Sequence, residues 1–512
     1  MKKIGIVIER NSYNKYLYES IKKLSLSDQI ELYFLRDRDI SRDRFQLFFF
    51  RLITKIEYFI MSILNPTVTI ERELFNIDET IYEDIEKIKS LELDLIINTH
   101  AEIPKRFIFI AKDGLISINY SQNRTPQAFW EVYHKEPSSR FSIELWSRES
   151  NTPQILLQGA IQTQRSYTEN RVYLFSNATP YLSKIVIEYA TTNRLPKPKL
   201  SLPLGEPRFT TPTIFELIYY IFKTKAIIIS TIIKRLILKK QRRWGVAFLK
   251  SNWNHAILKN GIEIKNLPNR YFADPFVITR DNRTVCFVED YYYDKAKATI
   301  TAIELIDNSY VVLGTIIDEP FHLSYPFIFE YNDELYMVPE SCESKSIRLY
   351  KCVEYPMRWE YQQDIISDID ATDSIIFEHD SRWWLLCNMS IDGNSDYSAT
   401  LMGFYSDNPL SNNWKPHSQN PLVFDSTIAR NGGGLNLNAD TLPIRSRQRQ
   451  GFNEYGEGFS LAQIEKLTPS SYQEIEIAKF TPSFFKNIRA SHHIHSDGNY
   501  TVYDYMRWDR FK

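Results

Sequence analysis

Four acidic residues occupy matching positions of a pattern that repeats in the C-terminal half of the chain. Residues 273–290, 324–341 and 372–388 each contain an apolar strand, a polar turn with Asn or Asp, and an aromatic strand. When the copies are aligned, Asp274 matches Asp373 and Glu289 matches Glu340. Tyr325 takes the first position in the second copy, and Asn388 lies nearest to the second position in the third.

These four carboxylates are candidate catalytic residues. Equivalent positions of successive repeats lie around one axis, so we expect Asp274, Glu289, Glu340 and Asp373 to converge at one mouth of a channel. Carboxyl groups gathered in a pocket raise one another's pKa and provide a general acid and a general base. Separations of about 6.5–9.5 Å suit inverting glycoside cleavage, and about 5–5.5 Å suits retention. The alternative is that each carboxylate only makes a turn or holds blades together through backbone N–H groups.

Other polar side chains near the repeats are candidates for substrate binding. His322, Tyr325 and Arg447 could form hydrogen bonds with sugar hydroxyls. An HHxH cluster, His492, His493 and His495, has the residue type of a metal ligand but no carboxylate at helical spacing. We therefore predict no metal site and no cofactor.

The repeat itself predicts a five-bladed β-propeller. The copies lie about 50 residues apart, which is the length of one blade of four strands. Two weaker copies follow at residues 431–448 and 492–505. Five blades would then occupy residues 244–512. A β-sandwich also uses hairpins, but it would not repeat the same residues at the same phase.

The N-terminal part, residues 1–192, has the pattern of an α/β domain. Buried strands are expected at Lys2–Ile8, Ile30–Leu35 and Leu93–Thr99, with an amphipathic helix at Asn14–Leu26. Alternation of strands and helices is typical of a parallel sheet. No GxGxxG motif follows the first strand, so the dinucleotide-binding motif is missing. The chain is thus expected to be multidomain, with a Rossmann-like α/β domain followed by the all-β propeller.

Residues 193–243 are predicted to join the two domains by a Pro-rich linker and a basic amphipathic helix. The helical pattern covers residues 213–243, and a second apolar helix is expected at residues 44–66. Charged residues interrupt both segments, so neither resembles a clean membrane span. Peripheral contact with an anionic membrane through residues 213–243 is one interpretation. The other is an interdomain helix that is buried on one face.

The composition excludes some classes of function. The 512 residues carry a net charge of −1, so no global field attracts nucleic acid. The 32 Tyr, 31 Phe and 9 Trp suit both sugar faces and the cores of large β domains. The four cysteines, Cys286, Cys342, Cys352 and Cys387, show no metal-finger spacing and are expected to be buried thiols. The N-terminus resembles a first strand rather than a signal peptide, and a cytoplasmic, possibly membrane-associated protein is expected.

The propeller region resembles a known family. The stretches "FADPF", "HLSYPFIFE", "YMVPES", "SIRLYKCVEYPMRWE" and "YGEGFSLAQIEKLTPSSYQE" are similar to the N-terminal region of glucosamine inositolphosphorylceramide transferases. The fold also looks like that of family 43 and family 32 glycoside hydrolases, whose acids line the propeller axis. These enzymes have an Asp as the base in the first blade, and Asp274 is a residue of the same type in the first repeat. Their remaining acids come in the order Asp then Glu, whereas Glu340 precedes Asp373 here.

The N-terminal domain resembles methionyl-tRNA and sugar-nucleotide formyltransferases. The motifs are "DLIINT", "GLISINYSQNRTPQAFWE" and "NTPQILLQG". The resemblance implies a reaction that uses an Asn, a His two residues later, and an Asp before a Gly. Asn119 matches the Asn, but Ser121 replaces the His, Asn151 replaces the Asp and Pro153 replaces the Gly. Loss of the base alone costs about 10²–10⁴-fold in rate. We therefore expect a degenerate site, with His134 as a candidate substitute base.

Three hypotheses follow for function in cell-surface polysaccharide or glycoconjugate biosynthesis. The first is a carbohydrate-active propeller, hydrolase or transferase, with Asp274, Glu340 and Asp373 as its acids. The second is a non-catalytic protein that binds or assembles glycans. The third is a sugar N-formyltransferase that uses 10-formyltetrahydrofolate near Asn119. In each, the partner is a sugar or glycan rather than a nucleic acid.

Overall fold

The chain divides into two compact units, residues 1–227 and residues 228–512. The computed structural model describes residues 1–8, 12–36, 46–77, 79–99, 103–121, 125–148, 152–198, 210–390, 396–435 and 442–510.

Unit 1 is built on a seven-stranded mixed sheet in the order β5-β3-β1-β6-β7-β8-β9. The strands are β1 (Lys2–Val7), β3 (Ile30–Leu35), β5 (Ile81–Tyr82), β6 (Leu95–Asn98), β7 (Leu115–Tyr120), β8 (Ser138–Trp146) and β9 (Gln154–Gln162). Neighbours from β5 to β7 run parallel, while β8 and β9 run antiparallel. The predicted α/β pattern is confirmed, and the antiparallel hairpin makes the sheet mixed rather than wholly parallel.

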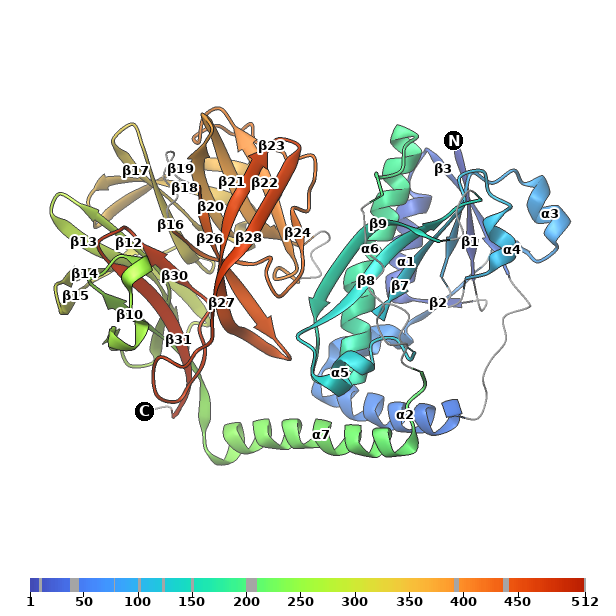
Figure 1. The fold of residues 1–512 in the computed structure, drawn as a ribbon, viewed down its shortest axis with the longest axis horizontal. Helices are drawn as coiled ribbons and strands as arrows, with labels where there is room; N and C mark the ends of the chain where they lie inside the picture. The colour runs from blue at the N-terminus through green and yellow to red at the C-terminus, as the bar shows by residue number, and fades with distance from the viewer. Residues whose placement is uncertain are drawn as a thin grey trace. The chain divides into compact units, whose positions relative to one another are not determined.

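Helices accompany the sheet of unit 1 (Figure 1). They are α1 (Lys15–Ser25), α2 (Gln46–Leu64), α3 (Ile85–Ser90), α4 (Lys105–Ile108), α5 (Trp130–His134) and α6 (Tyr167–Thr192). A short pair, β2 (Ser12–Asn14) and β4 (Leu74–Asn76), lies apart from the main sheet. Helix α1 begins where Asn14 caps it, because the Asn14 side chain accepts a hydrogen bond from the N–H of Leu17. Helix α6 is capped in the same way by Ser166.

Unit 2 is a propeller of five sheets, as the repeat predicts (Figure 1). The first four blades take their strands in chain order: β12 (Arg270–Arg280), β13 (Arg283–Tyr292), β14 (Lys297–Ile306), β15 (Ser309–Ile317); β16 (Ser324–Tyr331), β17 (Glu334–Glu340), β18 (Ser346–Glu354), β19 (Arg358–Ser367); β20 (Ala371–His379), β21 (Arg382–Met389), β22 (Thr400–Ser406), β23 (Lys415–Pro416); and β25 (Asn431–Leu435), β26 (Ile444–Gly451), β27 (Glu454–Thr468), β28 (Ser471–Phe480). Strand β24 (Val423–Phe424) pairs with β22.

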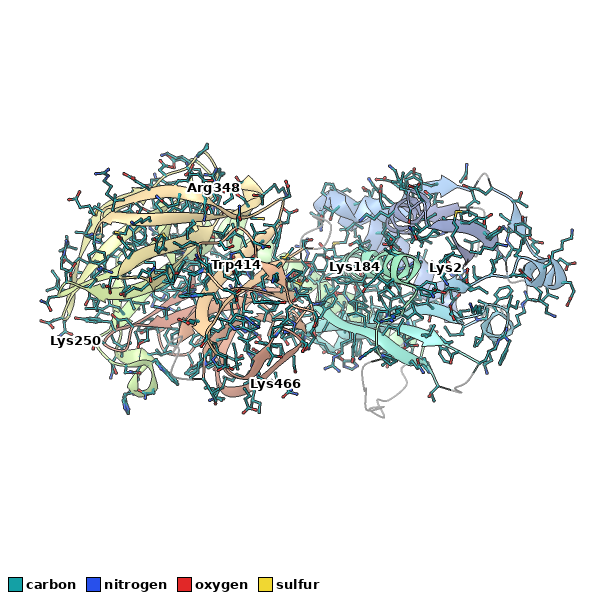
Figure 2. All side chains as sticks on the ribbon, turned by 90° about the horizontal axis from the view of Figure 1, so that it is seen from above. Lys2, Lys184, Lys250, Arg348, Trp414 and Lys466 are labelled. Atoms are coloured by element: carbon teal, nitrogen blue, oxygen red, sulfur yellow. The ribbon has the colours of Figure 1, made fainter. Side chains whose placement is uncertain are left out.

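The fifth blade combines the two ends of the unit. It contains β10 (Lys240–Leu249) and β11 (Ile262–Ile264) together with β29 (Ile488–Ala490), β30 (Ile494–Ser496) and β31 (Thr501–Arg510). The early strand β10 pairs with the last strand β31 along its whole length. Side chains fill the space between the blades, and Trp414 is one of the buried residues of a hydrophobic core cluster in this unit (Figure 2).

The innermost strands share a local irregularity. Strands β12, β16, β20 and β25 each have a register shift against the next strand, near the end where they begin. Asp274, Tyr325 and Asp373 lie at these bulges with φ of 48°, 47° and 48°. A bulge re-aims a side chain, and Asp tolerates this left-handed conformation better than most residues. The repeat therefore places chemically important residues at equivalent, specially shaped positions.

The predicted helix before the propeller is shorter than expected. Helix α7 covers Ile214–Ile232, a π-helical turn covers Ile233–Ile237, and strand β10 begins at Lys240. The expectation of helix up to Arg243 was wrong because residues 240–243 pair with β31 instead. Arg242 also forms an ion pair of 3.1 Å with Glu454. Part of the predicted linker, residues 199–209, lies outside the described residues.

Two further expectations are confirmed, the second for three of the four cysteines. Helix α2 occurs where the second apolar helix is predicted. The cysteines are free thiols, with Cys286, Cys352 and Cys387 buried and Cys342 half-buried. Among the described residues, no helix combines the length and the apolar character that crossing a membrane requires.

Candidate active site

The four predicted carboxylates come together at the propeller axis. Asp274 and Asp373 lie on the bulges of β12 and β20, while Glu289 and Glu340 lie opposite the bulges, on β13 and β17. Asp274, Glu289 and Asp373 are buried, and Glu340 is half-buried. Each of Asp274, Glu289 and Glu340 is close enough to the other acids for their charges to shift its pKa.

The surroundings make three of these groups hold their protons near neutral pH. Burial raises the pKa of Asp274 to about 7, although the nearby His492 acts in the opposite direction. Burial, followed by the charge of Asp373, raises the pKa of Glu340 to about 8. Burial and the charge of Asp274 raise the pKa of Glu289 well above its ordinary value. Carboxyl groups with such proton affinities are suited to general acid–base work.

Arg430 sets Asp373 apart from the other three acids. Its Nε donates a hydrogen bond of 2.6 Å to Asp373 Oδ2, and Gln448 Nε2 donates a second one of 3.2 Å. Burial acts to lower the pKa of Arg430, but the charge of Asp373 raises it well above the ordinary value. Arg430 also lies over the ring of Tyr455, 5.3 Å from its centroid. Asp373 is therefore the ion-paired member of the cluster.

A second array connects Asp274 to the last blade. Asp504 Oδ1 accepts hydrogen bonds from the backbone N–H groups of His492 and His493, at 2.8 and 3.1 Å. Asp504 Oδ2 contacts His492 Nδ1, and His492 Nε2 lies 3.4 Å from Asp274 Oδ1. Burial acts to lower the pKa of His492, but the Asp504 charge raises it above the ordinary value. Asp504 thus orients the imidazole toward Asp274.

Sequence reasoning missed both Arg430 and Asp504. Neither lies at the repeat positions that carry Asp274 and Glu289, so the alignment of copies offered no signal for Arg430. The aromatic strand "TVYDYM" of the fifth copy contains Asp504, and it was a usable signal because an acidic residue interrupts an otherwise buried apolar strand.

The three histidines of the HHxH cluster do not act as one unit. His493 Nδ1 lies 3.7 Å from Asp274 Oδ1, and burial lowers its pKa well below the ordinary value. His495 Nδ1 accepts a hydrogen bond of 3.2 Å from the N–H of Val277, and burial lowers its pKa to about 4. Within the described part of the chain, the side chains close enough to share a cation are Asp274, His492 and Asp504, with ligand atoms within 4.8 Å of one another.

Aromatic rings and His322 lie beside the acids. The ring centroids of Tyr271 and Tyr291 lie 4.9 Å apart in a stacked arrangement. Burial, followed by the charge of Glu289, raises the pKa of Tyr271. His322 Nε2 lies 3.6 Å from Glu289 Oε1, and its ring lies 6.1 Å from that of Tyr291. Tyr271, Tyr291 and His322 are all half-buried, so they border the site in a position where a sugar ring could stack.

Tyr325 and Arg447, which were expected to bind substrate, instead contact other groups of the protein. Tyr325 is fully buried, and its hydroxyl accepts a hydrogen bond of 2.9 Å from the N–H of Gly433. Arg447 is buried and is paired with Glu474 at 3.2 Å and with Glu476. Both side chains fill the propeller core because their polar atoms find partners there. The expected contact with substrate is therefore corrected for these two residues.

In unit 1, the described residues of the loop that is predicted to resemble a formyltransferase site are occupied by local contacts. Asn119 Nδ2 donates a hydrogen bond of 2.9 Å to Glu144 Oε1. Ser121 is buried, and its hydroxyl accepts a hydrogen bond of 2.7 Å from the N–H of Ala128. His134 is exposed and stacks on Trp130. Asn151 lies outside the described residues.

Comparison with known proteins now adds to this geometry. Residues 251–495 match the family model "Glucosamine inositolphosphorylceramide transferase 1, N-terminal". The predicted resemblance of the propeller to this family is confirmed. The chain is 33% identical over 214 residues to glucosamine inositolphosphorylceramide transferase 1 of Oryza sativa subsp. japonica, and 34% identical over 215 residues to that of Arabidopsis thaliana. Each match covers 41% of this chain and 28% of the plant protein, so less than a third of the relatives' length is matched.

Solved structures with partial similarity are glycoside hydrolases. The catalytic domain of a family 62 α-L-arabinofuranosidase from Coprinopsis cinerea shares 12% identity, with a TM-score of 0.35, over 50% of this chain and 84% of that one. A family 43 glycoside hydrolase shares 13% identity, with a TM-score of 0.30, over 41% and 76%. The propeller assignment rests on the sheet topology rather than on these scores. The formyltransferase-like character of unit 1 stays a prediction.

Proposed function

We propose that the propeller carries an acid–base site that cleaves or transfers a glycosyl group. The observation that carries the proposal is the cluster itself: Asp274 and Glu340 share one buried site, and their pKa values are raised to about 7 and about 8. The matched plant relatives are named glucosamine inositolphosphorylceramide transferases, which supports a sugar substrate. The pathway is that of cell-surface polysaccharide or glycoconjugate assembly.

The geometry supports separate roles for the acids. Glu340, with the higher pKa of these two and a half-buried position, donates a proton to the leaving oxygen as the glycosidic C–O bond breaks. Asp274, beside His492, accepts the proton of the water or sugar hydroxyl that attacks the anomeric carbon. Asp373, paired with Arg430, supplies a fixed negative charge near the cationic transition state. Glu289 positions His322 at the rim.

The experiment compares variants of the acids on a panel of glycans and activated glycosides. Glu340→Gln and Asp274→Asn are expected to lower turnover by about 10²–10⁴-fold while the fold is kept. Glu330→Gln is the matched control, because Glu330 is exposed on β16 and lies outside the cluster. Full activity of both cluster variants on a substrate that the native protein turns over would refute the assignment.

A second candidate function is glycan binding without turnover. The burial of Asp274 and Asp373, at 6% and 1% exposure, favours it, because groups this deep have little room to contact a substrate at the reacting bond. Calorimetry that shows sugar binding, together with no released or transferred product on the same ligand, would identify this function. Binding that is lost in Tyr271→Ala but kept in Glu340→Gln would support it further.

For unit 1, we propose a non-catalytic role as a binding or supporting domain. The Ser121 hydroxyl is bound to the N–H of Ala128 and has no basicity near neutral pH, so it does not replace the missing base. The alternative, N-formyl transfer from 10-formyltetrahydrofolate, requires a folate site beside Asn119. A thermal shift on addition of folate that Asn119→Ala abolishes would overturn the proposal.

A further inference from the structure

Helices α2 and α7 expose an unusual number of large apolar side chains in unit 1. On α2, the exposed residues are Phe48, Phe49, Leu52, Ile56, Phe59, Ile60, Ile63 and Leu64. On the part of α7 that belongs to unit 1, they are Ile214, Phe215, Ile218, Tyr219 and Phe222. Soluble proteins rarely expose apolar surface on this scale unless another molecule covers it.

The opposite faces of these helices are fixed to the rest of unit 1. Glu57 of α2 accepts hydrogen bonds from the N–H and the hydroxyl of Thr168, at 2.8 and 2.7 Å, and another from the Tyr220 hydroxyl of α7. That hydroxyl also accepts a hydrogen bond of 2.7 Å from the N–H of Tyr167. The two helices therefore meet at Glu57 and Tyr220.

Most charges on the exposed faces are positive. Arg51 and Lys55 of α2 and Lys225 of α7 are exposed. The one acidic residue of α2, Glu57, points into the protein, where its burial raises its pKa. Glu216 of α7 is engaged by Thr213, whose backbone N–H donates to it at 2.7 Å. A surface of this kind complements an anionic layer with an apolar interior.

We propose that α2 and residues 214–227 of α7 form a docking surface that lies in the interface of an anionic lipid membrane. One interpretation of the sequence pattern is peripheral contact through residues 213–243 alone. The structure adds α2 and excludes residues 240–243, which belong to a propeller blade. Aromatic and aliphatic side chains enter the boundary between headgroups and acyl chains, while the basic residues contact anionic headgroups. Each helix has 19 residues and lies along the membrane rather than across it.

Charge and shape favour a lipid surface over a protein partner. The exposed apolar residues follow the length of both helices rather than one central cluster, whereas protein interfaces concentrate their energy in a few central pockets. The basic side chains interrupt the apolar face at Arg51 and Lys55, at intervals that suit snorkelling toward headgroups. A second copy of the chain on this face would bring these positive charges together, which is unfavourable.

The test is co-sedimentation of the full-length protein with vesicles. Vesicles of phosphatidylcholine with phosphatidylglycerol are compared with vesicles of phosphatidylcholine alone, and binding to the anionic vesicles is expected to be much stronger. The apolar variant Phe59→Ser/Phe215→Ser/Phe222→Ser removes side chains that are 66%, 80% and 71% exposed. It is expected to bind at least about tenfold more weakly. The charge variant Arg51→Gln/Lys55→Gln/Lys225→Gln is expected to bind about fivefold more weakly per charge removed and to lose salt sensitivity.

The matched control is Phe109→Ser/Lys105→Gln, which changes an exposed apolar and an exposed basic residue elsewhere in unit 1. It is expected to bind like the native protein. Native protein that ignores anionic vesicles would overturn the proposal, and so would an apolar variant that binds them unchanged. Analytical ultracentrifugation adds a further arm: a native dimer that the apolar variant converts to a monomer, without vesicle binding, would assign the face to a second copy instead.

Discussion

At the scale of single residues, the acids of the propeller site differ in whether a basic side chain lies beside them. Arg430 forms an ion pair with Asp373, and His492 lies beside Asp274. Glu340 accepts only a neutral hydrogen bond of 3.0 Å from Ser324 among the partners described. The acids therefore differ in proton affinity although they share one site, and such a difference separates a proton donor from a proton acceptor.

This arrangement predicts how stability depends on pH. The pKa of Glu340 rises from 4.5 to about 8 on folding, so the folded protein holds a proton that the unfolded chain releases. Stability from this group is fully present below about pH 4.5 and falls as the pH rises, until it levels off above about pH 8. Glu340→Gln cannot ionise, so its stability lacks this dependence on pH. The free energy of unfolding of the variant minus that of the native protein should therefore rise by about 1–3 kcal/mol between pH 5 and pH 9.

Urea unfolding at several pH values measures this difference. Asp274→Asn should show the same trend with a midpoint near its pKa of about 7. Because the acids are coupled, the midpoints belong to the cluster rather than to one residue. The exposed Glu330→Gln variant provides the reference slope. The prediction would be contradicted if the unfolding free energy of the native protein changed with pH, between pH 5 and 9, by the same amount as that of Glu340→Gln.

Sequence alone located the acids but not their partners. Asp274, Glu289, Glu340 and Asp373 are in phase with a repeat, and equivalent strands must meet at one axis. Arg430 reaches Asp373 across 57 residues, from a turn that the repeat does not define. Such long-range ion pairs depend on how blades pack, which no local pattern reveals.

At the scale of elements, the innermost strands are held together by close backbone contact. Gly433 of β25 has φ of 106°, and a Cβ there would lie 2.0 Å from the carbonyl oxygen of Ile494 on β30. Gly314 of β15 has φ of 125°, but a Cβ there would meet nothing within 4 Å. The two glycines share a backbone conformation that disfavours side chains and differ in the space around them.

The pair allows the steric effect to be measured. Gly314→Ala should cost about 1 kcal/mol of unfolding free energy through backbone strain alone. Gly433→Ala should cost about 3 kcal/mol or more, because β25 and β30 must separate to admit the methyl group. Chemical denaturation of both variants provides the comparison. Equal losses of unfolding free energy in the two variants would contradict the prediction, because the contact between β25 and β30 would then add nothing to the backbone strain.

Elements with a strong local pattern were predicted well. The hairpins at residues 273–290, 324–341 and 372–388 occur as β12–β13, β16–β17 and β20–β21. Helix α7 was extended too far because residues 233–243 continue its apolar and basic character. The sequence there fits a helix locally, and pairing with β31 decides the outcome instead.

At the scale of the whole chain, the propeller ring is closed by strands that are more than 250 residues apart. Strand β10 pairs with β31 from Lys240 opposite Arg510 to Leu249 opposite Thr501. On its other side β10 pairs with β11, so it lies between β11 and β31. The sequence repeat indicates a propeller but does not reveal this closure, because β10 pairs along its whole length with the distant β31 and only over three residues with its sequence neighbour β11. Ring closure makes the blades depend on one another, although each blade keeps an outer edge strand.

Ring closure predicts that a single break in β10 destabilises the whole unit. Ala247 is fully buried and pairs with both Glu263 and Tyr503, so Ala247→Pro removes a donor and distorts a central strand. It should cost about 3 kcal/mol or more and broaden or abolish the cooperative transition of the propeller. Val311→Pro is the control, because Val311 is exposed on β15, at the edge of its blade. Circular dichroism during denaturation measures the unfolding of both proline variants. If the two variants unfolded alike, the edge strand and the closing strand would contribute equally to the ring, and the closure argument would be wrong.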